Sequence, residues 1–553
     1  MTSRKNTLEP EAPYESYEVY HLTNTRDRQI ITDMLTGAEA LNHVSDAILE
    51  YLLSPEPGQK GPRCKTVIVE NQYRDKDHSK ALSSFYTRSF RPISSYCTRL
   101  HFFSGWFNNQ CLDEVPPKKF NSTYLGFCVL RPFTRRRIGR TVLKRQQYKS
   151  NLEFPTCQGD FPVNLAGIPL KTLGPAFMEQ DTMVSACATT AIWMSTTTMG
   201  QRFGLPQIST SEITELATQY FFTERSMPSA GLTHEQMAHC LRAMGYEPLK
   251  EIYFQDNKEI LHTIYSYVES EIPPILLCKM ATSDENHAIV AVGHGYRLPV
   301  RKPSKIGYDW PNDKPLVFSR SSEWVPYFLV HDDQRGPYRK LIPIDPNGHH
   351  PSLVDRISRT YPGIDIASLD LDQWLCPVTL EMPSGRAEIV NIWGILVPLP
   401  RGVILTFAQA EAKSAYVIRL WHWLRSLPLR KDLVLRTYLL PSNDYKIRVR
   451  DSRMNPFVRS VILGKPMSRW IWVTEISSVR SYNSPDPVNW KISGQVIIDA
   501  TSNEFTPDFL VFHLILGGRG YLLTMKPGDT DAKDAMSNFW YSIHDNQYPG
   551  WVR

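Results

Sequence analysis

The sequence contains no apolar stretch long enough to span a membrane, which takes about 18 consecutive apolar residues, and its N-terminal segment has no apolar core of the signal-peptide type. Its nine cysteines are scattered without regular spacing, and their number is odd. These absences argue against a membrane protein and against a disulfide framework. We therefore expect a cytoplasmic protein with reduced thiols and no membrane association, although secretion without a cleavable signal stays open.

The chain also has little excess of either charge, because 62 Lys and Arg against 56 Asp and Glu leave a formal net charge of +6 over 553 residues. One segment, Arg131–Arg145, is strongly basic, with seven Lys or Arg in fifteen residues. Such a run can bind phosphates, but more often it is a solvated turn, here between strands at 125–130 and 141–143. We therefore do not expect nucleic acid as a partner and keep it as the weakest alternative.

Signatures of cofactors and metals are missing as well. The cluster Gly517-Gly-Arg-Gly520 lacks the Lys-Ser/Thr pair of a phosphate-binding loop and is better explained as a hairpin turn. His349-His350, and His234 with His239, have no further ligands at a spacing useful for zinc. We expect neither a cofactor nor a metal.

Proline is abundant, with 41 residues in a chain that is 42% hydrophobic and 21% charged. This composition is typical of a globular protein with many short strands, and the length exceeds what one core can use. We expect an α+β protein in which a helix covers Ile30–Leu53. The expected organisation is a flexible tail at 1–15, a mixed α/β domain at 16–158, a central domain of helices followed by an antiparallel sheet at 159–352, a linker at 353–385 and an α/β domain at 386–553.

The most informative segment is Gln180-Asp-Thr-Met-Val-Ser-Ala-Cys187-Ala-Thr-Thr-Ala-Ile-Trp-Met194, which is typical of a loop that ends in a cysteine at the start of an apolar helix. A helix N-terminus lowers the pKa of a thiol, and only the thiolate is a nucleophile. The Gln180 amide, with the backbone N–H of Cys187, could bind a developing oxyanion. A cysteine taken alone is more often a small buried hydrophobe, so the prediction depends on its neighbours.

A histidine-led strand follows about a hundred residues later, at Asn286-His287-Ala-Ile-Val-Ala-Val-Gly293. A histidine at the first position of an apolar strand lies at the rim of its sheet, where it can meet a helix start, although it can also be a plain core histidine. An acid that orients the imidazole is expected at a later strand end. We favour Asp332, because its strand follows the histidine strand most directly, with Asp333 and Asp345 as alternatives.

This arrangement resembles the papain-like cysteine peptidases and, more specifically, the bacterial double-glycine leader peptidases and their stand-alone relatives. The resemblance covers about residues 160–350 and includes Gly231-Leu-Thr-His-Glu-Gln236, a segment with a helix-capping box. It implies a papain-like central domain in which Cys187 is the nucleophile, His287 the general base, Asp332 the orienting acid and Gln180 the oxyanion donor. The chain departs from the family in having Ala188 where Gly is common, and in a Gln one residue farther from the Cys.

The resulting hypothesis is a cytoplasmic cysteine peptidase that cleaves a peptide or isopeptide bond in a protein or peptide substrate. An acyltransferase of the transglutaminase kind would use the same triad, and an inactive papain-like scaffold for protein binding is the non-enzymatic alternative. The oligomeric state stays open. An insertion at about 297–323, with four prolines and the aromatic residues Tyr308 and Trp310, is expected to be a loop without regular structure that borders the cleft.

Overall fold

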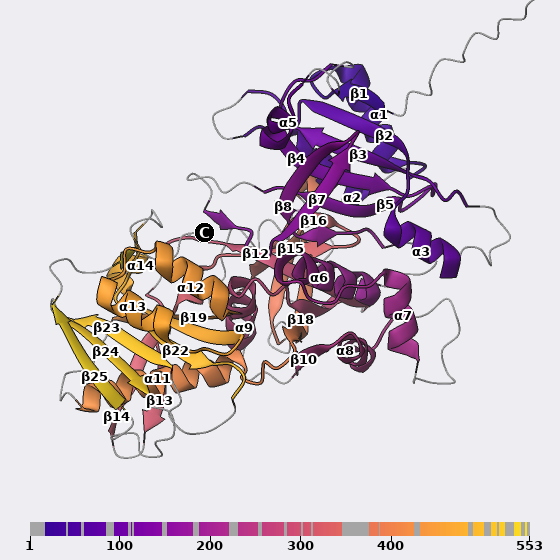
Figure 1. Cartoon of the computed structure of the whole chain (residues 1–553). Coiled ribbons are helices and arrows are strands. Elements are labelled where there is room, and N and C mark those ends of the chain that lie inside the picture. Colours follow the sequence, from indigo (N-terminus) through magenta and orange to yellow (C-terminus); the bar gives the residue numbers. More distant parts are fainter. Residues whose placement is uncertain are drawn as a thin grey trace, which may run out of the picture.

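The computed structural model has the α+β organisation that the sequence predicts, with several largely antiparallel sheets and helices packed on them (Figure 1). The structure describes residues 17–549 except 40–41, 57–59, 85–92, 109–111, 113–114, 146–151, 181–186, 220–230, 253–256, 281–284, 300–301, 311–312, 345–374, 386, 425–431, 485–489, 503–509, 517–518, 526–535 and 543–547. The tail expected at 1–15, the first two thirds of the expected linker, Asp345 and the pair His349-His350 therefore lie outside the described residues.

The N-terminal part is built on a six-stranded sheet in the order β1-β2-β3-β4-β5-β9. Its strands are β1 (Tyr17–His21), β2 (Thr66–Tyr73), β3 (Cys97–Phe103), β4 (Tyr124–Leu130), β5 (Ile138–Leu143) and β9 (Ala176–Phe177). The accompanying elements are the helices α1 (Thr25–Thr36), α2 (His43–Leu53), α3 (Lys76–Ser84) and α5 (Pro117–Thr123) and the hairpin β7 (Gly159–Leu165) with β8 (Ile168–Gly174). Strand β9 leads directly into the segment that ends at Gln180.

The single helix expected over Ile30–Leu53 is wrong, because two helices occupy this range. Gly37 ends α1 with a backbone φ of 65°, a left-handed value that glycine adopts without strain. Asn42 then caps α2, its side-chain oxygen accepting from the backbone N–H of Ser45. The apolar period continues across the break, which is why the sequence pattern did not reveal it.

The central sheet is antiparallel, in the order β10-β18-β11-β12-β15-β16-β17, and the short strand β6 (Glu153–Phe154) pairs with β12. The strands are β10 (Tyr246–Glu251), β18 (Ala387–Pro400), β11 (Ile275–Met280), β12 (Asn286–Gly295), β15 (Phe328–Asp332), β16 (Gly336–Pro343) and β17 (Pro377–Glu381). The helices beside it are α6 (Cys187–Phe203), α7 (Thr210–Thr218), α8 (His234–Ala243) and α9 (Asn257–Glu269). A capping box opens α8, where Thr233 and Gln236 exchange side-chain and backbone hydrogen bonds as expected.

The sheet does not stop at residue 352, where we expected the central domain to end. Strand β17 comes from the segment expected as a linker, and β18 comes from the expected C-terminal domain. Strand β18 lies between β10 and β11, and both β17 and β18 continue the antiparallel pairing. Their position depends on long-range pairing, which local sequence patterns do not specify.

The C-terminal sheet has the order β13-β14-β19-β20-β22-β23-β24-β25. Its strands are β13 (Ile306–Trp310), β14 (Asp313–Arg320), β19 (Leu433–Pro441), β20 (Trp470–Ser478), β22 (Gly494–Asp499), β23 (Val511–Leu516), β24 (Arg519–Met525) and β25 (Met536–Ser542). Around it lie α11 (Phe407–Leu424), α12 (Ser442–Asp451), α13 (Pro456–Gly464), α14 (Val479–Tyr482), the pair β21 (Lys491–Ile492) with β26 (Tyr548–Pro549), and the 3-10 turns Ser321–Trp324 and Pro383–Gly385.

The expectation of an unstructured insertion at 297–323 is wrong, because this segment contributes the hairpin β13–β14 to the C-terminal sheet. Strand β14 runs parallel to β19, and the hydroxyl of Tyr308 donates to Glu411 of α11 at 3.1 Å. Pro315 lies on β14 before the residues that pair with β19, so its missing N–H does not interrupt that ladder. Tyr308 therefore packs against the C-terminal part and not against the histidine strand.

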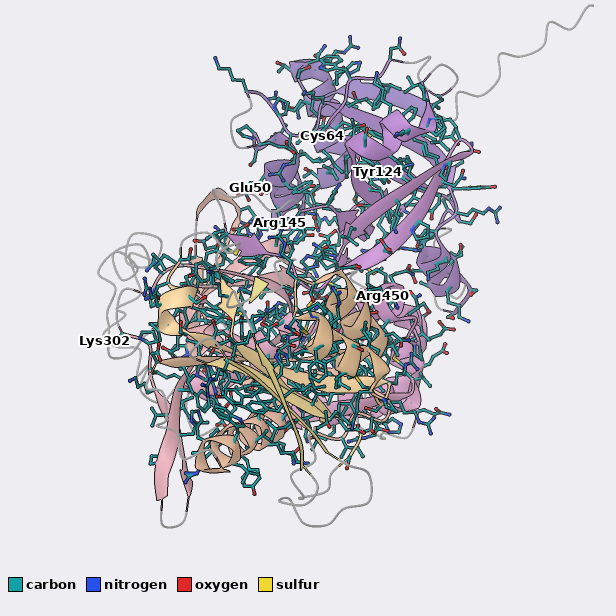
Figure 2. The ribbon with its side chains drawn as sticks, turned by 60° about the vertical axis from the view of Figure 1, so that its left-hand side comes forward. Glu50, Cys64, Tyr124, Arg145, Lys302 and Arg450 are labelled. Atoms are coloured by element: carbon teal, nitrogen blue, oxygen red, sulfur yellow. The ribbon has the colours of Figure 1, made fainter. Side chains whose placement is uncertain are left out.

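The three sheets share one continuous hydrophobic core, which includes residues from Leu22 in the N-terminal part to Leu523 in β24. In Figure 1 the strands β12, β15 and β16 of the central sheet lie between the N-terminal sheet (indigo to purple) and the C-terminal sheet, which is orange to yellow except for its pink hairpin β13–β14. Glu50 and Arg145, labelled in Figure 2, lie where the N-terminal part meets the rest of the chain. Within the described residues, no helix is both long enough and apolar enough to cross a membrane.

Candidate active site

Cys187 is the first residue of α6. The backbone N–H groups of a first helical turn have no partner within the helix, and together with the helix dipole they stabilise a negative charge such as a thiolate. Cys187 is partly exposed, whereas the seven other cysteines in the described part of the chain are buried. The rest of α6 is fixed by packing, because every residue from Ala188 to Gly200 is buried. Position and access therefore distinguish Cys187 from those other thiols.

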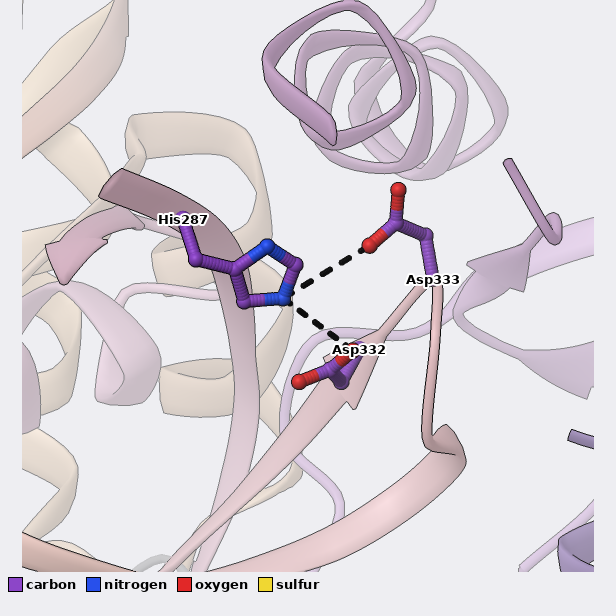
Figure 3. A group of neighbouring side chains, drawn as sticks. All are labelled: His287, Asp332 and Asp333. Carbon is purple, nitrogen blue, oxygen red and sulfur yellow. Dashed lines mark ion pairs between the residues drawn. The ribbon is translucent and has the colours of Figure 1, made fainter. Parts of the chain in front are cut away.

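His287 lies at the start of β12, opposite Cys278 of β11, and its side chain is buried. Its Nε2 atom is 3.2 Å from Oδ1 of Asp332 and 3.7 Å from Oδ1 of Asp333 (Figure 3). The Asp332 contact is an ion pair and not an aligned hydrogen bond, since Nε2 has no hydrogen-bond partner of good geometry among the described residues. The Cys187 side chain interacts with the His287 imidazole and contributes to raising the pKa of His287.

The electrostatics of the site favour a charged imidazole. Burial alone would lower the pKa of His287, but the charge of Asp332, the contact with Cys187 and the charge of Asp333 outweigh it and raise the pKa well above the ordinary value. An imidazolium beside a thiol favours the thiolate, and it can also give its proton to a leaving group.

Asp332 is fully buried at the end of β15, where the chain turns into β16. Its Oδ1 accepts from the backbone N–H groups of Gln334 at 2.9 Å and Arg335 at 3.1 Å, and its Oδ2 lies 3.2 Å from Nη1 of Arg335. Burial would raise the pKa of Asp332, but Arg335, His287 and the hydrogen bonds reverse this and hold the pKa well below its usual range. Asp332 is therefore a carboxylate whose position is fixed by its own turn.

Arg335 is a site residue that the sequence did not single out. Its guanidinium links Asp332 to Glu388 of β18, with Nε 2.7 Å from Oε2 of Glu388. An Asp at the end of a strand often stabilises the following turn by accepting hydrogen bonds from the backbone N–H groups two and three residues later. The segment Asp332-Asp-Gln-Arg335 is therefore recognisable in the sequence as such a turn. The partner on β18 could not be foreseen, because it comes from a part of the chain that we expected in another domain.

Asp333 is as deeply buried as Asp332, yet neither of its carboxylate oxygens has a hydrogen-bond partner among the described residues. Burial and the nearby charge of Asp332 raise its pKa to about 7, although His287, Arg335 and Arg136 act in the opposite direction. Below pH 7, Asp332 is therefore ionised while Asp333 is mostly protonated.

Gln180 lies beside the same turn. Its backbone N–H donates to the carbonyl of Asp333 at 3.3 Å, and its side-chain oxygen accepts from Nε2 of Gln334 at 3.4 Å. That orientation uses the oxygen end of the amide, and the nitrogen end is the one an oxyanion would need.

The N-terminal part holds the segment before Gln180 in place. Glu179 is buried, and its carboxylate accepts from the backbone N–H of Ile138 at 3.0 Å and from Asn42 at 3.1 Å. Nη2 of Arg131 donates to the backbone carbonyl of Glu179 at 3.0 Å. Arg140 pairs with Asp75 at 2.7 Å. The basic segment 131–145 is thus a turn with flanking strands, as expected, but Arg131 and Arg140 take part in internal contacts and are not simply solvated.

His287, Asp332 and Asp333 are also the only group of three metal-ligating side chains found among the described residues, with ligand atoms within 4.8 Å of one another. Imidazole and carboxylate are ordinary ligands for zinc. Oδ1 of Asp332 already accepts two backbone N–H groups, however, and the Arg335 cation lies beside this carboxylate. The two acids therefore suit a positively charged imidazole better than a metal ion bound beside the Arg335 cation. Of the other histidines considered, His234 pairs with Glu235.

No protein-family model matches the sequence, and no curated protein matches it either. The site must therefore be judged by its own geometry. The structure brings Cys187, His287 and Asp332 together from α6, β12 and the end of β15, with Gln180 beside the acidic turn. A thiol at a helix start, an imidazole and a buried carboxylate are the parts needed for acyl transfer to and from a thiol.

Proposed function

We propose that the protein is a cysteine peptidase of papain-like architecture that acts on a peptide or isopeptide bond in a protein or peptide substrate. Cys187 is the nucleophile, His287 the proton-transfer residue and Asp332 the acid that orients the imidazole. Gln180 is the oxyanion donor, with the backbone N–H of Cys187. The observation that carries the proposal is the interaction of a partly exposed, helix-initiating thiol with an imidazole that also pairs with a buried carboxylate.

The reaction follows from these positions. The Cys187 thiolate forms a bond to the carbonyl carbon, and the carbonyl oxygen becomes an oxyanion near the start of α6. When the C–N bond breaks, the His287 imidazolium gives its proton to the departing amine and leaves an acyl-thioester on Cys187. Water then gives a proton to neutral His287 and attacks the thioester carbon. The products are a carboxylic acid, the thiolate and the imidazolium. Asp332 stays ionised throughout and holds the ring.

Labelling of the intact protein with iodoacetamide at pH 7, with the modified residues located by mass spectrometry, tests the nucleophile. We expect Cys187 to react at least about tenfold faster than any other cysteine, because an ordinary thiol is only a few per cent thiolate at this pH. Cys187→Ser should remove the fast label, and His287→Ala should slow it by about tenfold or more. Uniformly slow labelling of all nine cysteines would overturn the proposal and favour a non-enzymatic scaffold.

The same protein distinguishes hydrolysis from transfer to an amine. Incubation of a peptide library with and without an excess of a primary amine should yield free carboxyl termini in both samples if water is the acceptor. If peptide–amine conjugates form and no free carboxyl termini appear, the protein is an acyltransferase in which the same residues have the same roles. The Cys187→Ser variant is the control for both products.

A further inference from the structure

Asp333 is an unexplained feature of the site. It is fully buried, both of its carboxylate oxygens lack a hydrogen-bond partner among the described residues, and its Oδ1 lies 3.7 Å from Nε2 of His287 (Figure 3). A buried polar group without partners costs free energy, so its presence needs a reason. The expected peptidase chemistry does not supply one, because Asp332 alone can orient the ring.

The groups around Asp333 indicate which side chain its carboxylate acts on. The charged or titratable groups that act on it are His287 of β12, Asp332 and Arg335 of its own turn, and Arg136 from the turn between β4 and β5. Arg335 is already engaged by Asp332 and by Glu388. The Asp333 carboxylate points toward the imidazole of His287 (Figure 3), and the two side chains are within ion-pair distance.

We propose that Asp333 is a second positioning carboxylate for His287, which joins Asp332 in stabilising the imidazolium once Asp333 has lost its proton. The inference rests on the proposed function, because it concerns the proton-transfer residue of that site. Asp333 thereby adds a pH-dependent effect to a triad in which the acid, Asp332, is ionised over the whole range of pH considered.

The two acids then act in different ranges of pH. Arg335 and two backbone N–H groups keep Asp332 charged, so its effect on His287 is constant. Asp333 has a pKa of about 7, raised first by burial and then by Asp332, so it is neutral in acid and charged in weak alkali. Its negative charge therefore appears in the range in which an imidazolium begins to lose its proton, and it should extend the life of the imidazolium to higher pH.

Carboxymethylation by iodoacetate provides a test that needs no substrate. The thiolate sulfur of Cys187 forms a bond to the methylene carbon while the C–I bond breaks and iodide leaves with the electron pair. The reagent is an anion, so a neighbouring imidazolium attracts it, and the rate falls when His287 becomes neutral. The rate at Cys187, followed by mass spectrometry from pH 4 to 10, should therefore rise with thiolate formation and fall with loss of the imidazolium.

Asp333→Asn should move the alkaline limb of this profile to lower pH by about one unit, the size expected when one opposite charge near the ring is removed. Its acid limb should stay in place, because Asp333 is already neutral there. Asp332→Asn, the matched control, should move both limbs, because Asp332 is charged throughout the range. Thermal unfolding of each variant shows whether it is folded.

The possible failures are distinguishable. If Cys187 is not preferentially modified in the wild-type protein, the proposed function fails. If Cys187 is preferentially modified but the alkaline limb of folded Asp333→Asn coincides with that of the wild type, the role of Asp333 fails alone. Protection of wild-type Cys187 by Zn²⁺ that is lost in Asp333→Asn would overturn the inference in favour of a metal site at His287, Asp332 and Asp333.

Discussion

Asp332 and Asp333 are neighbours in sequence and equally buried, yet their surroundings shift their pKa values in opposite directions. Asp332 points into a turn that supplies two backbone N–H groups and a guanidinium, whereas Asp333 points to the imidazole edge without a hydrogen-bond donor among the described residues. The comparison shows that local donors, and not depth of burial, decide the charge of a buried carboxyl group here.

This difference predicts how stability depends on pH. The pKa of Asp333 is about 7 in the folded protein, raised mainly by burial, against 3.8 for an ordinary Asp, so the folded state binds more protons between these values. Stability from this group is therefore present below about pH 4 and is lost as the pH rises to about 7. Asp333→Asn has no carboxyl group to ionise, so it does not lose this stability as the pH rises. Its free energy of unfolding should therefore exceed that of the wild type by about 2–4 kcal/mol at pH 8.

Urea unfolding at pH 5 and pH 8 measures this gain. The control is Asp160→Asn, because Asp160 is about half exposed and pairs with Lys171 on the surface. That variant should differ from the wild type by less than about 1 kcal/mol at both pH values. A gain for Asp333→Asn that is the same at pH 5 and pH 8 would contradict the assigned titration.

Local sequence patterns placed Cys187, His287 and Asp332 near the ends of predicted elements, but they could not show the charge states of these side chains. These three residues each lie at or next to the end of an element, and local sequence patterns indicate such ends. The pairing of Arg335 with Glu388 and the isolation of Asp333 depend on tertiary packing. Asp345 cannot be compared, because it lies outside the described residues.

At the scale of elements, the turn between β15 and β16 is held by helix α2 of the N-terminal part. Gly336 begins β16 with a backbone φ of 105°, and a Cβ at this position would overlap with the Cβ of Ala47 in α2. Arg339 of β16 pairs with Glu50 of α2 at 3.0 Å. The turn that bears Asp332 and Asp333 is thus a packed contact and not a free loop.

Gly336→Ala should therefore be destabilising, by about 2–4 kcal/mol, because it adds backbone strain and a steric overlap with α2. It should also slow iodoacetamide labelling of Cys187, since the acidic turn must shift away from His287. Thermal unfolding and labelling at pH 7 measure the two effects.

The matched control is Gly402→Ala. Gly402 also has a positive φ, 88°, but a Cβ there would meet no atom within 4 Å, so only the backbone cost of about 1 kcal/mol is expected. An equal loss of stability in the two variants, with unchanged labelling, would show that α2 does not support the turn.

Element prediction succeeded where local chemistry was decisive. The strands around His287 and Asp332 were expected near their observed positions, and the capping box at Thr233 is present. The hairpin β13–β14 was missed because prolines and mixed polarity suggest a loop, and its pairing with β19 connects residues more than a hundred positions apart. Local patterns cannot report such a partner.

At the scale of the whole molecule, the chain passes repeatedly between the central and C-terminal sheets. Strands β13 and β14 belong to the C-terminal sheet, and strands β17 and β18 return to the central one. A shared hydrophobic core joins them. Domain limits drawn along the sequence therefore do not coincide with the sheets, which explains why the pattern of expected helices and strands placed the boundary at 352.

A buried ionic network reinforces this junction. Arg436 of β19 lies between Glu269 at the end of α9 and Glu475 of β20, with Nε 2.8 Å from Oε2 of Glu269 and Nη1 2.9 Å from Oε2 of Glu475. Glu269 also contacts Nε2 of His294 at 2.7 Å, on β12, the strand that carries His287. The network thus connects the central sheet and its helix to the C-terminal sheet.

Arg436→Met should lower the midpoint of thermal unfolding by on the order of 5–10 °C, because removing one member of a buried ion network leaves its partners uncompensated at a cost of about 3–5 kcal/mol. Arg450→Met is the control, since Arg450 is exposed on α12 (Figure 2) and a surface substitution should change stability by less than about 0.5 kcal/mol. His287 and His294 are seven residues apart on an extended strand, which places the network roughly 20 Å from the site. Labelling of Cys187 in folded Arg436→Met should therefore match the wild type, and slowed labelling would show that the junction also positions the site.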